Sequence, residues 1–267
     1  MMPHPALTTI LAVTCLLACD EPLSPQAPSA AAAERLVWED QFDRPGLPDA
    51  SRWDYEVGLV RNNERQYYTH ARSKNARVED GLLVIEAHRE AFEGAEYTSA
   101  SLTSRASWTY GRIEVRAQLP RGRGTWPAIW TLGTNIREVG WPRCGEIDIM
   151  EHVGFDPGRI HANIHTQAYN HVQRTNKGNS LLVSRPDETF HVYEAIWTPT
   201  QIEMLVDGQR YFTFAKEAGG EAVWPFDQPQ YLILNLAIGG SWGGQQGIDD
   251  AALPARYLID YVRVYRR

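Results

Sequence analysis

The chain has 267 residues, a formal net charge of -7, nine Trp and twelve Tyr. That length fits one large all-β domain, because sandwiches and barrels reach roughly 200–250 residues without splitting. The acidic balance, with no run rich in Lys or Arg, excludes nucleic acid and anionic membrane surfaces as partners, since both attract clustered positive charge. Aromatic rings with a polar edge suit partly wet binding faces, so a neutral polymer such as a polysaccharide stays open as a partner.

Residues 1–18 are predicted to be a signal peptide, because residues 6–18 form an apolar run too short to span a bilayer as a helix. Leu16-Leu17-Ala18-Cys19 has the form of a bacterial lipobox, in which Cys19 is lipidated and becomes the new N-terminus. Signal peptides usually begin with a segment that contains Lys or Arg, whereas His4 is the only basic residue before this run. The alternative is an ordinary cleaved signal in which Cys19 has no role. We expect a protein of the bacterial cell envelope or the extracellular space, touching membrane only through a lipid at Cys19.

Residues 19–34 are predicted to be a tether. The stretch from 20 to 34 is rich in Pro, Ser and Ala and lacks aromatic and β-branched residues, so it has too little apolar surface to order itself. Once the signal peptide is removed, Cys19 and Cys144 are the remaining cysteines, and we expect no internal disulfide. The folded domain is expected to span 35–267, to depend on its core for stability and to be a monomer.

Short runs of alternating apolar and polar residues follow, separated by Gly, Pro, Asn and Asp. Residues 111–119 alternate most clearly, which predicts a strand with one buried and one wet face. Asp207-Gly208 lies between runs at 201–206 and 209–214 and predicts a tight hairpin turn. Further strands are predicted at 82–87, 231–238 and 257–265. Together these runs predict an all-β fold of two packed antiparallel sheets.

Three carboxylates lie among apolar residues in one of these runs: Glu146, Asp148 and Glu151. Packed like charges raise one another's pKa, which keeps one carboxylic acid protonated beside an ionised one. In a regular strand Glu151 would point away from the other two, so we expect a bulge near Ile149 or Met150 that returns it to their face. The alternatives are a solvated acidic strand edge, which the apolar neighbours disfavour, and a Mg²⁺ or Ca²⁺ site, which usually draws on loops with Gly and Asn.

His161 and His165 are spaced like a zinc pair on a helix, but the Glu of an H-E-x-x-H motif is absent, so the spacing argues against a zinc site. On a strand both share one face, and either can reach the cleft, whereas a hydrogen-bonded structural role for His161 is equally compatible with the pattern.

The run from Trp141 to Gly154, W-P-R-C-G-E-I-D-I-M-E-H-V-G, is similar to the active-site signature of glycoside hydrolase family 16, in particular its laminarinase-like members. Further blocks resemble the family in the same order: N-N-E-R-Q-Y-Y-T, Y-G-R-I-E-V-R-A-Q-L-P, G-T-W-P-A-I-W, W-P-F-D-Q-P, L-N-L-A-I-G-G-S-W-G-G and D-Y-V-R-V-Y. They cover nearly all of the chain after residue 36. The resemblance implies a β-jelly-roll with a carbohydrate cleft on its concave face, and cleavage of β-glycosidic bonds with retention.

Matched to the signature, Glu146 falls on the nucleophile, Glu151 on the acid/base and Asp148 on the assisting carboxylate between them. No cofactor is required for this chemistry. Other matches resemble sugar contacts: Asn62, Arg105, Trp126, Trp130, Trp141 and His165. Trp126 and Trp130 share a face of the predicted strand, and we expect at least one of them in the cleft rather than in the core.

The family often carries a structural calcium on the convex side, and the Gly81 carbonyl with Asp260 matches that site. Laminarinase-like relatives usually have Glu where this chain has Gln41, and a neutral ligand weakens a site for a hard cation. A second departure is Leu59-Val60-Arg61, where many laminarinases have Gly-Trp-Gly, and it bears on substrate preference.

The resemblance therefore implies a secreted endo-β-1,3-glucanase acting on β-glucan. Mixed-linkage glucan and algal galactans such as agar and carrageenan are alternative substrates on the same fold, and transglycosylation is an alternative reaction. A non-catalytic β-glucan-binding protein is the alternative from another class. Relatives of that kind have lost the catalytic carboxylates, and both glutamates are present here.

Overall fold

Strands provide almost all the regular structure in the part of the chain that the computed structural model describes, which is Met1 and residues 34–266. The predicted signal peptide, most of the tether and the lipidation of Cys19 fall outside these residues. From Glu34 onward the chain is one compact unit. Among the described residues, no helix has both the length and the apolar character needed to cross a bilayer.

The strands form two sheets. The larger has ten strands, and its main path runs in the order β15 (Gln209–Ala215), β14 (Gln201–Val206), β13 (His191–Trp197), β8 (Gly111–Gln118), β17 (Ala255–Arg266), β5 (Leu82–Phe92), β6 (Ala95–Ser99) and β3 (Gln66–Tyr68). Off this path, β1 (Arg35–Asp40) pairs with β17 and β4 (Ala76–Glu79) with β5. All pairs are antiparallel except β3 with β6.

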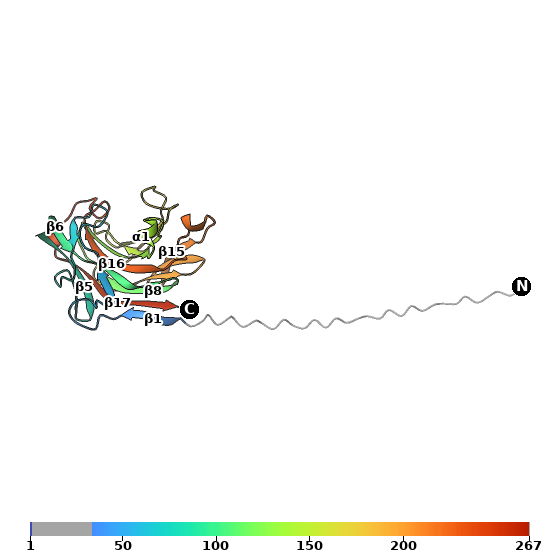
Figure 1. The fold of residues 1–267 in the computed structure, drawn as a ribbon, viewed down its shortest axis with the longest axis horizontal. Coiled ribbons are helices and arrows are strands. Elements are labelled where there is room, and N and C mark those ends of the chain that lie inside the picture. The colour runs from blue at the N-terminus through green and yellow to red at the C-terminus, as the bar shows by residue number, and fades with distance from the viewer. Residues whose placement is uncertain (2–33, 267) are drawn as a thin grey trace. The chain divides into compact units, whose positions relative to one another are not determined.

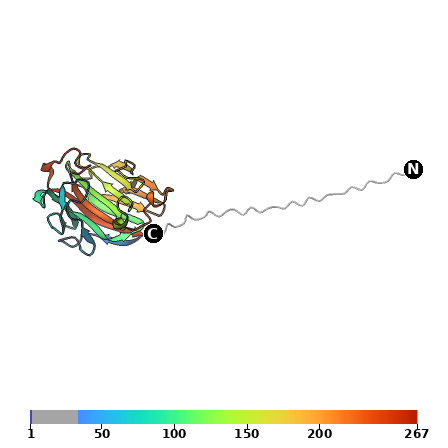
Figure 2. The ribbon, with the colours of Figure 1, turned by 45° about the horizontal axis from the view of Figure 1, so that its top comes forward.

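The second sheet has seven strands in the order β12 (Lys177–Leu182), β11 (Arg159–His165), β10 (Glu146–Glu151), β9 (Thr125–Gly133), β16 (Gln230–Ile238), β7 (Ser101–Trp108) and β2 (Trp53–Tyr55). The helices are short: α1 (Ile136–Val139), η1 (Gly220–Ala222) and η2 (Asp250–Ala252). In Figure 1, β16 of this sheet lies above β8 and β17 of the larger sheet, and α1 lies above β16. Figure 2 turns the same two layers toward the viewer.

The core lies between the two sheets, and alternation along the strands decides which residues enter it. In β8, Ile113, Val115 and Ala117 are buried in the core cluster, as the period-two pattern predicts. In the hairpin between β14 and β15, Asp207 and Gly208 both have positive φ, as the turn requires. The predicted all-β fold of two mainly antiparallel sheets is confirmed.

Candidate active site

The strand β10 carries the three carboxylates on the face that points away from the core. Ile147 and Ile149 alternate with them and are buried in the core between the sheets. Against β9, Asp148 faces Trp130 and Met150 faces Ile129, so Ile149 is an extra residue in β10. The predicted bulge is therefore confirmed. It shifts Glu151 onto the face that holds Glu146 and Asp148.

Before Glu146, the chain turns sharply at Gly145, whose φ is +78°. A Cβ at this position would lie against Pro225 and Phe226, so the turn needs both the conformational freedom and the small size of glycine.

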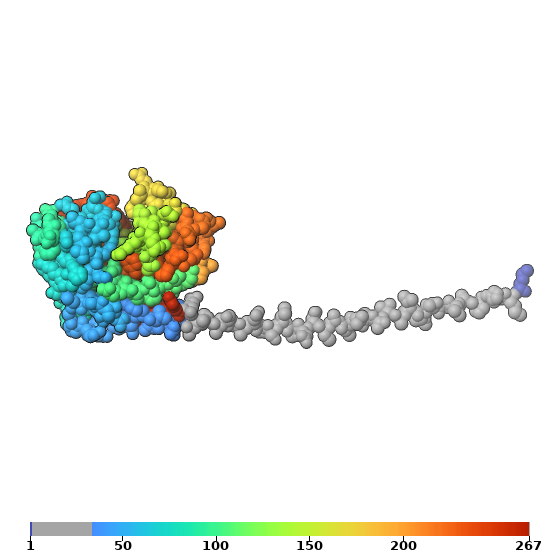
Figure 3. All heavy atoms as spheres, in the orientation of Figure 1, coloured from blue at the N-terminus to red at the C-terminus, as the bar shows by residue number. Residues whose placement is uncertain are grey.

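An open cavity of about 610 Å³ lies in front of these carboxylates. Figure 3 shows the surface hollowed at the top, between a blue-to-cyan segment and a yellow-green one. The floor of the cavity comes from β9, β10 and β16, and its sides come from the loops after β2, β9 and β11. The residues that line it are Glu56, Val60, Arg61, Asn62, Glu64, Trp126, Ala128, Trp130, Leu132, Ile136, Trp141, Glu146, Asp148, Glu151, His171, Val172, Tyr231 and Asn235. Its size and its mixture of aromatic and acidic side chains fit a polymer of polar sugar rings.

Each glutamate of β10 is held by side-chain donors. The Trp141 indole N–H donates to Glu146 Oε2 over 2.9 Å. Glu151 accepts a hydrogen bond from the Trp126 indole at Oε1, over 3.1 Å, and one from the Asn163 amide at Oε2, over 2.9 Å. These bonds fix the orientation of both carboxyl groups, which a directed reaction at a bound sugar requires.

Burial raises the pKa of all three acids. The pKa of Glu146 rises to about 8, because of burial and then the negative charge of Asp148, against the opposing effects of His165 and Trp141. Burial and Glu151 raise the pKa of Asp148 well above its ordinary value. Burial also raises the pKa of Glu151, against the bonds from Asn163 and Trp126 and the nearby His165. The trio therefore keeps at least one proton near neutral pH, as an acid catalyst working beside an ionised carboxylate requires.

Most of the predicted sugar contacts lie in or against this cavity. Asn62 lines it and donates to Glu64 over 3.3 Å. Trp126, Trp130 and Trp141 also line it. His165 lies beneath it, with Nε2 at 3.2 Å from Asp148 Oδ2. The second predicted histidine, His161, instead packs edge-on against Trp242 at 4.9 Å between ring centroids.

Trp130 offers little ring to a ligand. It is 7% exposed, and its indole N–H donates to Asn235 over 2.8 Å. The Arg61 guanidinium lies over its ring, 4.7 Å from the centroid, and pairs with Glu56. Trp141 is more exposed, so it is the better candidate for stacking on a sugar.

Arg105 is the exception among the predicted contacts, because it lies outside the residues that line the cavity. Its guanidinium donates to the Ala50 carbonyl over 2.7 Å and pairs with Asp54 at 3.3 Å. β7 also bulges at this point, where three residues centred on Arg105 face Leu232 alone. A sugar contact of Arg105 therefore stays a prediction.

Several residues of the cavity are missed by the sequence reasoning. Glu64 lies inside the N-N-E-R-Q-Y-Y-T block. Asn163 faces Asp148 across the pair of strands and lies midway between the two histidines, so period-two alternation alone places it on their face. Asn235 lies inside the L-N-L-A-I-G-G-S-W-G-G block, whereas Glu56 and Tyr231 come from distant segments and have no comparable signal.

Calcium at Gly81 and Asp260 stays a prediction, and the residues matched to that site have the following contacts. Gly81 lies in the turn between β4 and β5, and the Asp260 carboxylate is paired with the Arg116 guanidinium. Gln41 donates to Glu39 and accepts from Arg263. Asp260 and the amide oxygen of Gln41 therefore already have arginine partners, with which calcium, an ion that takes about six to eight oxygen ligands, would have to compete. No step of the chemistry below involves calcium.

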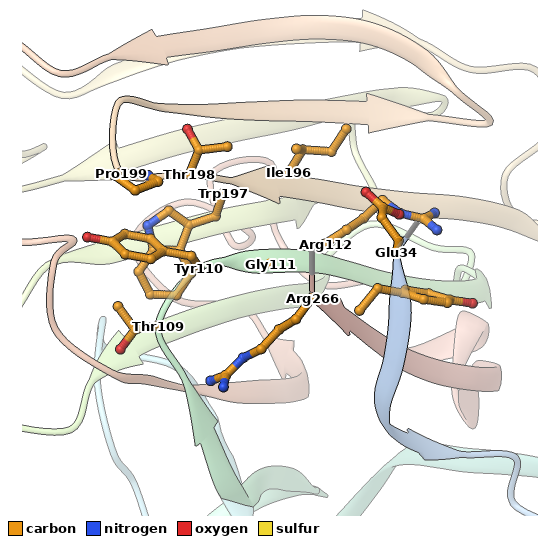
Figure 4. A pocket seen from close by; sticks show the side chains of 11 residues that line it. Glu34, Thr109, Tyr110, Gly111, Arg112, Ile196, Trp197, Thr198, Pro199 and Arg266 are labelled. Carbon is orange, nitrogen blue, oxygen red and sulfur yellow. The ribbon is translucent and has the colours of Figure 1, made fainter. Parts of the chain in front are cut away.

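A second cavity, of about 430 Å³, lies on the other sheet, at the ends of β8, β13 and β17 (Figure 4). It is lined by Tyr110, Trp197 and Tyr265 among others, and Glu34 pairs there with Arg112. Glu34 is the one acid among the described residues that line it, and it pairs with Arg112, as do Glu114 and Glu194 nearby. The chemistry therefore belongs to the cavity in front of β10.

Comparison with known proteins agrees with this geometry. The family model described as Glycosyl hydrolases family 16 matches residues 63–263. The chain belongs to this family. A beta-glucanase from Rhodothermus marinus is 55% identical over 242 residues, which are 86% of this chain and 85% of that protein. The family makes the chain a glycoside hydrolase.

Solved structures of family members give the same result. The X-ray structure of the laminarinase from Rhodothermus marinus superposes with a TM-score of 0.85 at 53% identity, over 88% of this chain and 98% of that one. A non-specific endo-beta-1,3(4)-glucanase called SCLam gives a TM-score of 0.84 at 48% identity, over 88% and 92% of the two chains. The resemblance to family 16 and the expected jelly-roll fold are confirmed.

Proposed function

We propose that this chain hydrolyses internal β-1,3 bonds of β-glucan with retention, using Glu146 as nucleophile and Glu151 as acid/base. The observation that supports this most is the carboxylate trio of the bulged β10, which faces an open cavity lined by tryptophan. The names of the similar proteins, beta-glucanase and laminarinase, support the substrate.

The reaction has two displacements. In the first, a Glu146 oxygen attacks the anomeric carbon while Glu151 gives its proton to the glycosidic oxygen, and the leaving chain departs with a free hydroxyl. In the second, Glu151 takes a proton from water, and the resulting hydroxide displaces Glu146 from the sugar. The bonds from Trp126 and Asn163 keep Glu151 aimed at the oxygen in both steps. Asp148 lies between the two glutamates in the sequence, and its side chain is 3% exposed.

A substrate panel tests this proposal. Purified protein is incubated with laminarin, lichenan, agarose and carrageenan, and the reducing ends released are measured. We expect the highest kcat/KM on laminarin and a size distribution of products typical of internal cleavage. Lichenan, a mixed-linkage glucan, is the alternative substrate that the similarity to SCLam favours. Cleavage of agarose without cleavage of laminarin would contradict the proposed substrate, and binding without release of reducing ends would contradict hydrolysis.

Replacing Trp141 by Ala is expected to raise KM on laminarin about fivefold, because a stacked ring contributes roughly 1 kcal/mol to binding. A loss of kcat is expected too, since the Trp141 indole holds Glu146. Tyr265→Ala is the matched control, because it removes an aromatic ring from the second cavity. An unchanged KM in Trp141→Ala, or an equal rise in both variants, would argue against stacking at Trp141.

A further inference from the structure

Three side chains of the active site present ligand atoms to one another. One potential ligand atom from each of Glu146, Asp148 and His165 lies within 4.8 Å of the other two. Among residues 34–266 this is the only group of three or more side chains arranged so that they could hold a metal ion. His165 Nε2 lies 3.2 Å from Asp148 Oδ2 and 3.6 Å from Glu146 Oε1. Glu146 and His165 face each other directly in the pairing of β10 with β11. The three atoms therefore come from one rigid pair of strands.

Two polar atoms of this group lack a hydrogen-bond partner within the described residues. They are Asp148 Oδ2 and His165 Nδ1, and their side chains are deeply buried, at 3% and 5% exposure. Asp148 Oδ2 faces His165 Nε2 at 3.2 Å without a hydrogen bond between them. An unsatisfied buried carboxylate oxygen is costly. A cation held between Asp148 Oδ2 and His165 Nε2 would satisfy this oxygen, whereas Nδ1 is the other nitrogen of the ring.

The distances indicate which ion fits. Zinc binds histidine nitrogen and carboxylate oxygen at about 2.0–2.2 Å, so two ligands of a tetrahedral zinc lie about 3.4 Å apart. The two separations that involve His165 Nε2, 3.2 and 3.6 Å, bracket that value, and the third, between Glu146 and Asp148, lies within 4.8 Å. An imidazole ligand also favours zinc over calcium or magnesium, which prefer oxygen alone and in larger number.

We propose that Glu146, Asp148 and His165 form a zinc site with its fourth position open to the cavity, and that zinc bound there blocks hydrolysis. The blockade rests on the proposed function, because it requires Glu146 to be the nucleophile. The binding of zinc does not depend on the proposed function. An ion coordinated by Glu146 and Asp148 removes the free oxygen that must attack the sugar, and it lies where the sugar must approach.

Isothermal titration of the full-length protein with zinc sulfate tests the binding. We expect one strong site per chain that is weakened at least about tenfold in Glu146→Gln and in His165→Asn, since even the loss of an outer partner costs roughly 10–100-fold in affinity. His191→Gln is the matched control, because it removes a histidine that pairs with the carboxylate of Asp207 on the other sheet. Thermal melting without zinc checks that each variant is folded, and Glu146→Gln keeps the shape of the side chain.

The outcomes separate the two claims. Loss of the strong site in both cleft variants but not in His191→Gln supports the zinc site, and unchanged binding in the cleft variants overturns it. Hydrolysis of laminarin by the wild type is then measured with zinc and after addition of a chelator. Inhibition that the chelator reverses supports the blockade, whereas full activity at saturating zinc overturns it. If the wild type cleaves no glucan but still binds zinc at this site, the proposed function fails and the zinc site stands.

Discussion

Glu146→Gln is expected to abolish hydrolysis, with a loss greater than the roughly 10²–10⁴-fold that acid/base catalysis contributes. The amide cannot attack the anomeric carbon, so no covalent intermediate forms, whatever the leaving group. A trapping experiment checks this: a 2-fluoro glycoside with an activated leaving group should label the wild-type protein and leave Glu146→Gln unlabelled in the mass spectrum.

Glu138→Gln is the matched control for this variant. It removes a carboxylate from α1, beside the cleft but outside the residues that line it. We expect it to be labelled like the wild type. The stereochemistry of the first product gives an independent check, because two carboxyl groups about 5–5.5 Å apart retain configuration and groups about 6.5–9.5 Å apart invert it. An initial α-anomer in the proton NMR spectrum would withdraw the nucleophile role from Glu146.

Glu151→Gln is expected to lower kcat on laminarin by about 10²–10⁴-fold, because the glycosidic oxygen then leaves without a proton. An aryl glycoside whose leaving group needs no proton should still form the intermediate, which accumulates because no base activates water for the second step. Azide needs no base, so it should restore turnover in this variant and give a β-glycosyl azide.

Comparison of the two glutamate variants tests which residue is the nucleophile and which is the acid/base. Rescue by azide in Glu151→Gln and none in Glu146→Gln fits the proposed roles, while the reverse pattern would exchange them. Asn163→Ala offers a graded comparison, because it removes one donor from Glu151 and leaves the acid in place. We expect a smaller loss of kcat in Asn163→Ala than in Glu151→Gln, and we expect turnover in Asn163→Ala without added azide.

Local patterns in the sequence predict the features that depend on neighbouring residues. Alternation along β8 predicts a buried face, and acids placed among isoleucines predict a bulge at Ile149, because otherwise Glu151 would point to the wrong side. The turn at Asp207-Gly208 follows from the positive φ that both residues adopt. In each case the cause lies within a few residues of the effect.

Contacts between distant segments are what the sequence leaves open. The spacing of Trp126 and Trp130 suits a sugar platform, but it does not show that Arg61, from a loop after β2, lies over the second ring. Arg105 occupies a matching position in the sequence, yet in the structure it lies beside a bulge opposite Leu232 and pairs with Asp54. The partner of a strand is set by the whole sheet, and at Arg105 the point where the pairing slips has no signal in the strand's own residues.

The position of the last strand in the larger sheet affects how the molecule is made. β17 lies between β8 and β5 and also pairs with β1, so the C-terminal segment joins strands from the first half of the chain. Until those final residues leave the ribosome, the middle of that sheet is missing and its neighbours present open edges. Folding of this sheet must therefore wait until β17 has been synthesised, and the reliance on pairings between remote segments predicts a slow reaction.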